Sequence, residues 1–189
     1  MFKKLPFIVV TLFATAFPLE AAEQILELDL DTTAVTFTLG STLHTVDGVL
    51  HLKEGRIVFD LDSGAASGRV VFDATLTETG NKKRDKKMHA KVLESGDFPD
   101  IVFTPETIEG TLNETGDSNL TLGGTVSIHG SDHPVTLKAT VERKGGTISA
   151  TSALTIPFVE WGMEDPSAFI FRADKQVEVS LRVQGILGE

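Results

Sequence analysis

Short runs in which apolar and polar residues alternate occupy most of the chain after residue 24. The clearest runs cover 35–39, 57–61, 70–76, 120–128, 135–141, 148–156 and 177–183. A period of two places the apolar side chains of a strand on one face and the polar ones on the other, which is typical of antiparallel sheets with one wet face. The segments HGSDHP at 129–134 and KGG at 144–146 predict hairpin turns between successive strands.

Strands of this kind need closure, because exposed sheet edges invite pairing with other chains. About eight of them in one domain form either a barrel or a sandwich. Hairpin-like connections throughout, with one helical interruption, favour an up-and-down barrel. No Pro- or Ser-rich linker, internal repeat or low-complexity tract divides the chain. We therefore expect one all-β domain over 23–189, an antiparallel, up-and-down, eight-stranded barrel.

The stretch 81–103, with the sequence NKKRDKKMHAKVLESGDFPDIVF, does not alternate. We expect a helix over 84–95, with Asp85 as its N-cap and Gly96 as the residue that ends it. A helix of about ten residues is marginal on its own. Its narrow apolar stripe should therefore pack on the barrel, and we predict that it lies across an open end as a lid or plug.

Residues 1–22 predict a cleaved secretory signal peptide. They combine Lys3 and Lys4, an apolar stretch over 5–17 and the small residue Ala22 at the end. The apolar stretch is too short for a membrane span. We expect export to the periplasm or secretion from the cell.

The composition narrows the classes of function. The chain carries a net charge of −10, and −11 without residues 1–22, which contain two lysines and one glutamate. An acidic exported chain argues against nucleic-acid binding. The absence of cysteine excludes disulfides and thiolate metal sites. Because the sequence contains no GxSxG elbow, HExxH motif or nucleotide-binding loop, we expect neither an enzyme nor a cofactor.

Six segments in order resemble a known family. They are LDTTAVTFTL, VDGVLHLKEGRIVFD, TGNKKRD, FPDIVFTP, GGTVSIHGSDHPVTL and FVEWGMEDPSAFIF. They run over nearly all of 26–185, and the chain resembles the YceI-like family, secreted lipocalin-like barrels associated with polyisoprenoid and other long-chain lipids. The resemblance implies a lipocalin-like barrel with one short helix near its mouth. It also implies a bound polyisoprenoid, isoprenoid quinone, or fatty amide or acid, with the apolar tail along the barrel axis.

Inward aromatic residues, the helix and the segment near 161 are candidates for contact with such a ligand. The candidate ligand-binding residues are Phe37, Phe59, Phe72, Met88, Val92, Phe103 and Trp161. Each Phe could equally belong to an ordinary packed core, and Trp161 could fill one end of the barrel instead of gating it. Small inward residues favour a hollow barrel. They are Ala74, Gly124, Ala139, Ala150 and Ser152.

Six basic residues gather between 82 and 91, around a helix N-terminus whose dipole they oppose. One interpretation is a solvated basic face. The other is an anion site at the barrel mouth, in which Lys83, Arg84 and Lys87 bind a phosphate head group or contact an anionic membrane surface.

Four histidines, His44, His89, His129 and His133, could meet at one end of the barrel. They lack carboxylate or thiolate partners at ligand spacing, so we predict no metal site. If they did converge, a metal-dependent or quinone-linked enzyme would be the alternative to a binding protein. A structural stress-response domain with a filled barrel is a further alternative. The oligomeric state stays open, with a homodimer among the options.

Overall fold

The alternating runs form one antiparallel sheet in a computed structural model of the chain, which describes residues 23–168, 170 and 172–188. Residues 1–22, where the signal peptide is predicted, lie outside the described residues. Within the described part the sheet has nine strands. They are β1 (Gln24–Leu28), β2 (Ala34–Leu39), β3 (Val46–Asp60), β4 (Ala65–Glu78), β5 (Asp100–Gly110), β6 (Asp117–Ile128), β7 (Ser131–Lys144), β8 (Thr147–Ile156) and β9 (Val177–Gly188).

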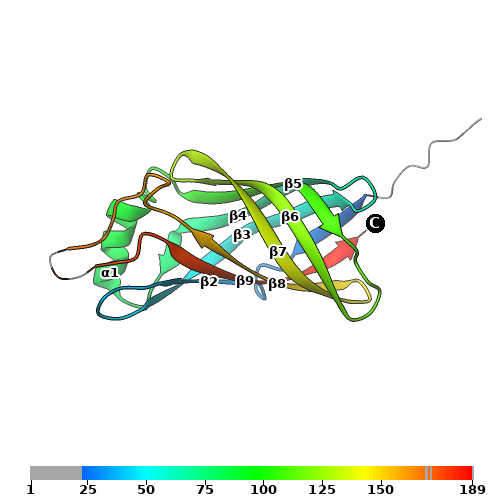
Figure 1. The fold of residues 1–189 in the computed structure, drawn as a ribbon, viewed down its shortest axis with the longest axis horizontal. Helices are drawn as coiled ribbons and strands as arrows, with labels where there is room; N and C mark the ends of the chain where they lie inside the picture. The colour runs from blue at the N-terminus through cyan, green and yellow to red at the C-terminus, as the bar shows by residue number, and fades with distance from the viewer. Residues whose placement is uncertain (1–22, 169, 171, 189) are drawn as a thin grey trace, which may run out of the picture.

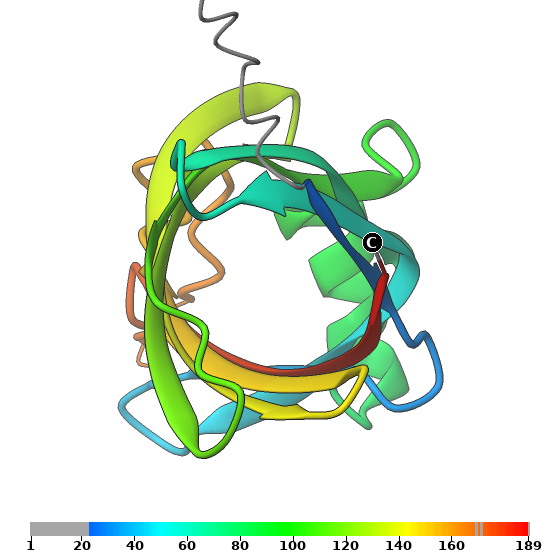
Figure 2. The ribbon, with the colours of Figure 1, turned by 90° about the vertical axis from the view of Figure 1, so that its right-hand side faces the viewer.

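Strands β1 and β2 share one place in the barrel wall. Both pair with β3 on one side and with β9 on the other, β1 near Arg56 and β2 near Leu50. Since β3 also pairs with β4, the sheet closes on itself, and Figure 2 shows the resulting ring. With β1 and β2 counted as one interrupted strand, the nine strands make a closed, antiparallel, eight-stranded barrel. The fold class expected from the sequence is confirmed.

Both predicted hairpin turns are present. His129 and Gly130 connect β6 to β7 with φ values of 51° and 75°. Positive φ at both central residues matches the right-handed twist of the flanking strands, and glycine adopts it without a steric penalty. Gly145, with φ of 61°, makes the turn between β7 and β8.

Two stretches of the barrel wall were not predicted as continuous strands. Strand β3 runs for 15 residues, whereas alternation was visible only in its second half. Its pairing with β4 shifts register twice, which breaks the period-two pattern. Strand β5 contains Pro105 beside another register shift, so the alternation there is too short to predict a strand.

The expected short helix is present, but it begins and ends earlier than predicted. Helix α1 spans Lys82–Lys87 and continues into a π-helical turn over Met88–Val92. The N-cap is Asn81, whose side-chain oxygen accepts from the backbone N–H groups of Lys83 and Arg84. Asp85 was the wrong choice because its carboxylate accepts from the backbone N–H of Thr79 instead.

The chain leaves this helix at Glu94, whose φ is 44°, and not at Gly96. The wide π-helical turn is followed by Glu94 in the left-handed conformation, so the glycine two residues later is not needed to end the helix. Figure 1 shows α1 across one end of the barrel, with the C-terminus near the other. In the described part of the chain, no helix has the length and hydropathy needed to cross a bilayer.

Candidate functional site

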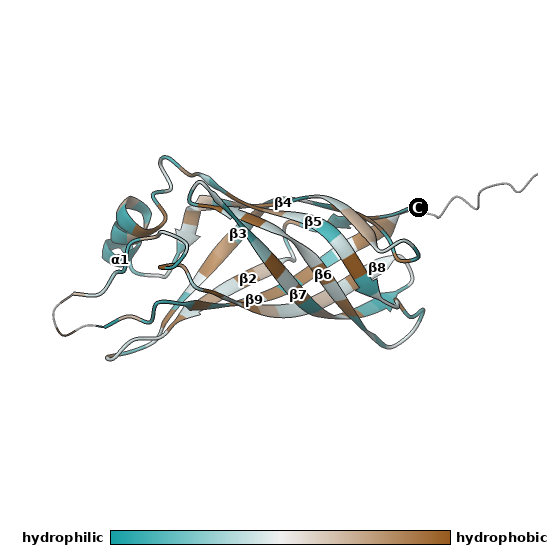
Figure 3. Cartoon of the chain, turned by 45° about the horizontal axis from the view of Figure 1, so that its top comes forward, coloured by the Kyte–Doolittle hydropathy of each residue, from teal (hydrophilic) through white to brown (hydrophobic). Residues whose placement is uncertain are grey.

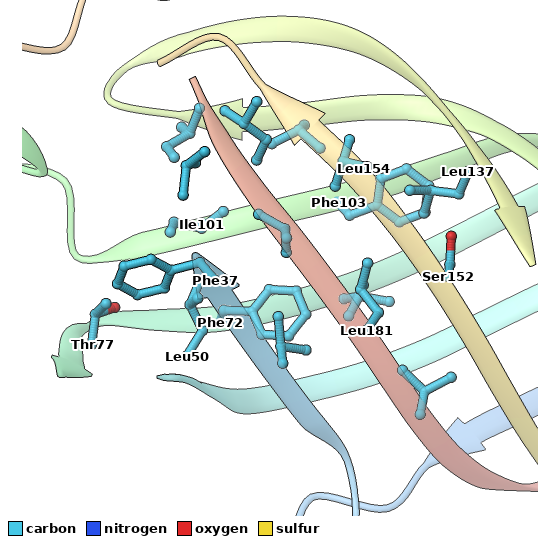
Figure 4. Close-up of a pocket in the computed structure, with 18 of the residues that line it drawn as sticks. Phe37, Leu50, Phe72, Thr77, Ile101, Phe103, Leu137, Ser152, Leu154 and Leu181 are labelled. Carbon is cyan, nitrogen blue, oxygen red and sulfur yellow. The ribbon is translucent and has the colours of Figure 1, made fainter. Parts of the chain in front are cut away.

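The inside of the barrel holds a cavity of about 700 Å³, within the range of sites that bind small molecules. Inward side chains from all nine strands line it, and most are aliphatic or aromatic. Figure 4 shows several of them converging on the same space. The labelled apolar ones are Phe37, Leu50, Phe72, Ile101, Phe103, Leu137, Leu154 and Leu181. A space of this size and polarity suits the apolar part of a ligand.

Small residues on two neighbouring strands help to keep the cavity open. Ala139, Ala150 and Ser152 line the cavity directly, on neighbouring strands β7 and β8. Ser152 also donates from its hydroxyl to the backbone carbonyl of Lys138, 2.9 Å away, so its polar atom is paired within the wall. Ala74, in contrast, is buried without lining the cavity.

Two glycines determine where the rings of two candidate residues lie. A Cβ at Gly48 would lie 2.2 Å from the Phe37 ring, on the paired strand. A Cβ at Gly124 would lie 2.9 Å from the Phe103 ring. Each ring therefore occupies the space that a side chain would take on the neighbouring strand, close against the wall. Gly124 was predicted among the small inward residues, whereas Gly48 was not.

Six of the seven candidate ligand-binding residues line the cavity. They are Phe37, Phe59, Phe72, Met88, Val92 and Phe103. The seventh, Trp161, does not line it; its indole ring stacks on His133 with ring centroids 4.0 Å apart and planes 3° apart. Phe158 and Met163, from the same segment, line the cavity instead and are both buried. Loop residues carry no periodic signal, so the sequence does not indicate which side chains of this segment face the cavity.

The helix end of the cavity is more polar than the rest. Among the candidate cations, Arg84 and Lys87 line this end, while Lys83 is exposed and lies outside the lining. The Arg84 guanidinium donates from Nε to the Thr79 hydroxyl at 2.7 Å and from Nη2 to the Thr79 carbonyl at 2.9 Å. Lys87 donates from Nζ to the carbonyl of Pro166, 3.2 Å away. These contacts hold the helix against the residue that follows β4 and against the loop before β9.

Thr77 adds a buried polar atom to this end of the cavity. Its side chain is 3% exposed and lines the cavity close to Phe37, as Figure 4 shows. Its hydroxyl has no hydrogen-bond partner among the described residues. A buried hydroxyl without a partner is unfavourable by about 1–3 kcal/mol. A polar group on a bound ligand is one partner that would remove this penalty.

Three of the four candidate histidines, His89, His129 and His133, each contact a different partner, and the fourth, His44, lines the cavity. His89 is 3.0 Å from the Ser95 hydroxyl, and His129 is 2.8 Å from a carboxylate oxygen of Glu94. His133 stacks on Trp161. Within residues 23–168, 170 and 172–188, no three His, Cys, Asp or Glu side chains are placed to hold a metal ion. That the histidines form no metal site therefore stays a prediction.

Comparison with known proteins shows the family to which the chain belongs and structures that share its fold. Residues 26–185 match the model of the YceI-like domain family, and the chain belongs to that family. It resembles, with 15% identity and a TM-score of 0.68, a domain from Saccharophagus degradans described as polyisoprenoid-binding and implicated in plant cell wall breakdown; the match covers 86% of this chain and 98% of that one.

BcnA of Burkholderia cenocepacia is similar in fold, with 18% identity and a TM-score of 0.64, over 83% of this chain and 98% of that one. At these identities the likeness establishes the shared barrel alone. A comparison with curated proteins found no match.

Proposed function

We propose that this protein is a non-catalytic carrier that holds one long-chain apolar ligand inside its barrel. The observation that carries the proposal is the apolar cavity of about 700 Å³ with contributions from every strand. A filled structural barrel would lack such a space. The ligand class is a polyisoprenoid, an isoprenoid quinone, or a fatty amide or acid.

The polarity of the lining gives the ligand a direction. Its tail lies among the aliphatic and aromatic side chains of the strands, while its polar end lies under the helix. Thr77, Arg84 and Lys87 are the groups there that can bind a hydrogen-bonding or anionic head group. Lys83 lies close to them in sequence and adds positive charge at the surface.

Two further observations support this proposal. The different partners of His89, His129 and His133 give no support to the enzyme alternative. The similar domain from Saccharophagus degradans is described as polyisoprenoid-binding, which is consistent with the same use of this barrel. Because residues 1–22 predict a signal peptide, the proposed site of action is the periplasm or the outside of the cell.

The test is native mass spectrometry of untagged protein, followed by organic extraction. The protein is purified from the periplasm or the medium of the cells that naturally produce it. We expect one bound molecule per chain, and an extract that contains a long aliphatic or isoprenoid chain. Protein that carries no small molecule, even after incubation with extracted lipids, would contradict the proposal. Zinc or copper bound at one equivalent would instead revive the enzyme alternative.

A further inference from the structure

Two of the most exposed large apolar side chains lie on loops at the helix end of the barrel. Leu43, in the loop between β2 and β3, is 63% exposed, and Ile170, in the loop between β8 and β9, is 83% exposed. In the sequence, Ile170 stands between Phe169 and Phe171. Exposed apolar residues gathered at one place indicate a binding surface more often than isolated ones do.

Hydrogen bonds join these two loops to each other. The backbone N–H of Thr42 donates to the carbonyl of Arg172 at 2.9 Å, and the N–H of Arg172 donates to the Thr42 hydroxyl at 3.1 Å. Ser41 and Ala173 form an antiparallel bridge beside these bonds. The two apolar side chains are therefore carried by one paired structure and not by two independent loops.

The basic helix belongs to the same surface. Lys87 donates to the Pro166 carbonyl, which ties the helix to the loop that carries Ile170. Figure 1 shows the helix and both loops at the same end of the barrel, and Figure 3 shows the helix in mainly hydrophilic colours. We call residues 40–45, 82–94, 157–168, 170 and 172–176 together the mouth rim.

The charge of the mouth rim differs from that of the remaining chain. The rim contains eight basic and six acidic residues, a net charge of +2, whereas the other residues of 23–189 contain seven basic and twenty acidic ones, a net charge of −13. The charge is uneven within the rim as well, because six of its eight basic residues lie between 82 and 91. Such a distribution orients the rim toward a negatively charged surface.

We propose that the mouth rim docks on an anionic lipid bilayer. Leu43 and Ile170 enter the head-group region, while the lysines of the helix face the lipid phosphates. The cavity then opens toward the bilayer, so that an apolar chain passes between membrane and barrel without crossing water. The proposal rests on the proposed carrier function and names the partner from which the ligand is taken or to which it is delivered.

The test is flotation of the protein with vesicles of phosphatidylcholine alone or mixed with phosphatidylglycerol. We expect binding to the anionic vesicles that weakens as salt rises. Ile170→Glu and Leu43→Glu should each reduce this binding about tenfold, because each removes an inserted apolar side chain and adds a repelled charge. Reversal of Lys82, Lys83, Lys86 and Lys87 to Glu should abolish it and slow ligand transfer from anionic vesicles.

Matched control variants lie away from the rim. Ile186 is 67% exposed on β9, near the C-terminal end of the barrel, so Ile186→Glu makes the same chemical change outside the rim. Lys144→Glu reverses one lysine charge outside the rim, at the turn between β7 and β8, and is compared with Lys83→Glu alone. Both controls should bind vesicles as the parent does. Equal losses in rim and control variants, or a parent that ignores anionic vesicles at low salt, would overturn the proposal.

Failure of the docking proposal can be separated from failure of the carrier proposal. Native mass spectrometry of the same rim variants reports the bound ligand, and thermal unfolding reports the fold. Ligand-loaded protein that does not bind vesicles would overturn docking alone, and docking without any ligand would overturn the carrier function alone. Binding of the rim to an acidic protein in place of vesicles would also overturn the lipid assignment.

Discussion

The absence of a side chain at position 48 allows the ring of Phe37 to lie against the barrel wall. A Cβ there would meet the ring at 2.2 Å and the carbonyl of Glu78 at 2.8 Å, so an added methyl group has no free space. The ring could move only toward the cavity, where it would occupy the volume assigned to the ligand. One missing side chain on β3 thus helps to keep the barrel hollow.

We expect Gly48→Ala to destabilise the protein by about 1–3 kcal/mol, as overpacked substitutions do. For a domain of this size that corresponds to a fall in Tm of about 2–4 °C per kcal/mol. The displaced ring should also reduce the amount of bound ligand seen by native mass spectrometry. Gly96→Ala is the control, because no atom lies within 4 Å of its added Cβ. A Gly48→Ala protein as stable as this control would contradict the assigned role.

Asp29 organises the loop that interrupts the strand formed by β1 and β2. The backbone N–H groups of Thr32 and Asp31 donate to its carboxylate at 3.0 and 2.9 Å, and they hold the pKa of this carboxyl below its ordinary value. A lowered pKa in the folded state stabilises the fold above the unfolded-state pKa of about 3.9, and the contribution disappears as pH falls through the lowered value.

We therefore expect Asp29→Ala to lower Tm at neutral pH, with a difference from the parent that narrows below about pH 4. Thermal unfolding of both proteins across the acid range measures this difference. Asp31→Ala is the control. Asp31 takes part in these hydrogen bonds through its backbone N–H and not through its carboxylate, so the substitution leaves both bonds in place. A difference that stays constant through the acid range would show that the carboxylate charge is not the cause.

At the scale of whole elements, periodicity predicts the wall of this barrel better than it predicts the helix and the loops. Regular strands such as β9 alternate over most of their length, here over 177–183, so their faces can be assigned from the sequence. The helix could be predicted, but its cap could not, because Asn81 and Asp85 are both good N-cap residues and only the fold brings Thr79 to Asp85. The position of Trp161 could not be predicted for a related reason: its stacking partner His133 is distant in sequence.

The cap at Asn81 leads to a prediction about the helix. Asn81→Ala should remove both hydrogen bonds to the first turn and destabilise the helix by about 1 kcal/mol. Amide hydrogen exchange should accelerate over residues 83–88 more than in the strands. Asn81→Asp keeps an acceptor at the same place and should exchange like the parent. If the Ala and Asp variants exchange alike, the cap does not determine the stability of this helix.

At the scale of the molecule, the closed sheet explains how a barrel with a large internal space can remain folded. Backbone hydrogen bonds join each strand to its neighbours around the ring, so the wall does not depend on a solid interior. Figure 2 shows this continuity from one end. A ligand that fills the cavity would add stability by binding the folded state only. The stability of the purified protein should therefore depend on what it carries.

Filling the cavity with protein atoms separates the stability of the barrel itself from the stability that a bound ligand adds. Ala139 and Ala150 both line the cavity, on the paired strands β7 and β8. Replacing both with Leu should abolish ligand uptake, while the ligand-free stability stays the same or rises, since each buried methylene contributes about 0.8 kcal/mol where it fits without strain. Native mass spectrometry and thermal unfolding of delipidated protein measure the two effects.

Thr136 and Thr140 provide the matched control for this double substitution. Both lie on β7 with exposed side chains that point away from the cavity, so their replacement with Leu adds similar bulk outside the barrel. This control should bind ligand as the parent does. Because filling the interior leaves the rim unchanged, the Ala139 and Ala150 variant should also still bind anionic vesicles. A folded variant that retains its ligand after this filling would show that the ligand lies elsewhere, and the cavity would then lose its assigned function.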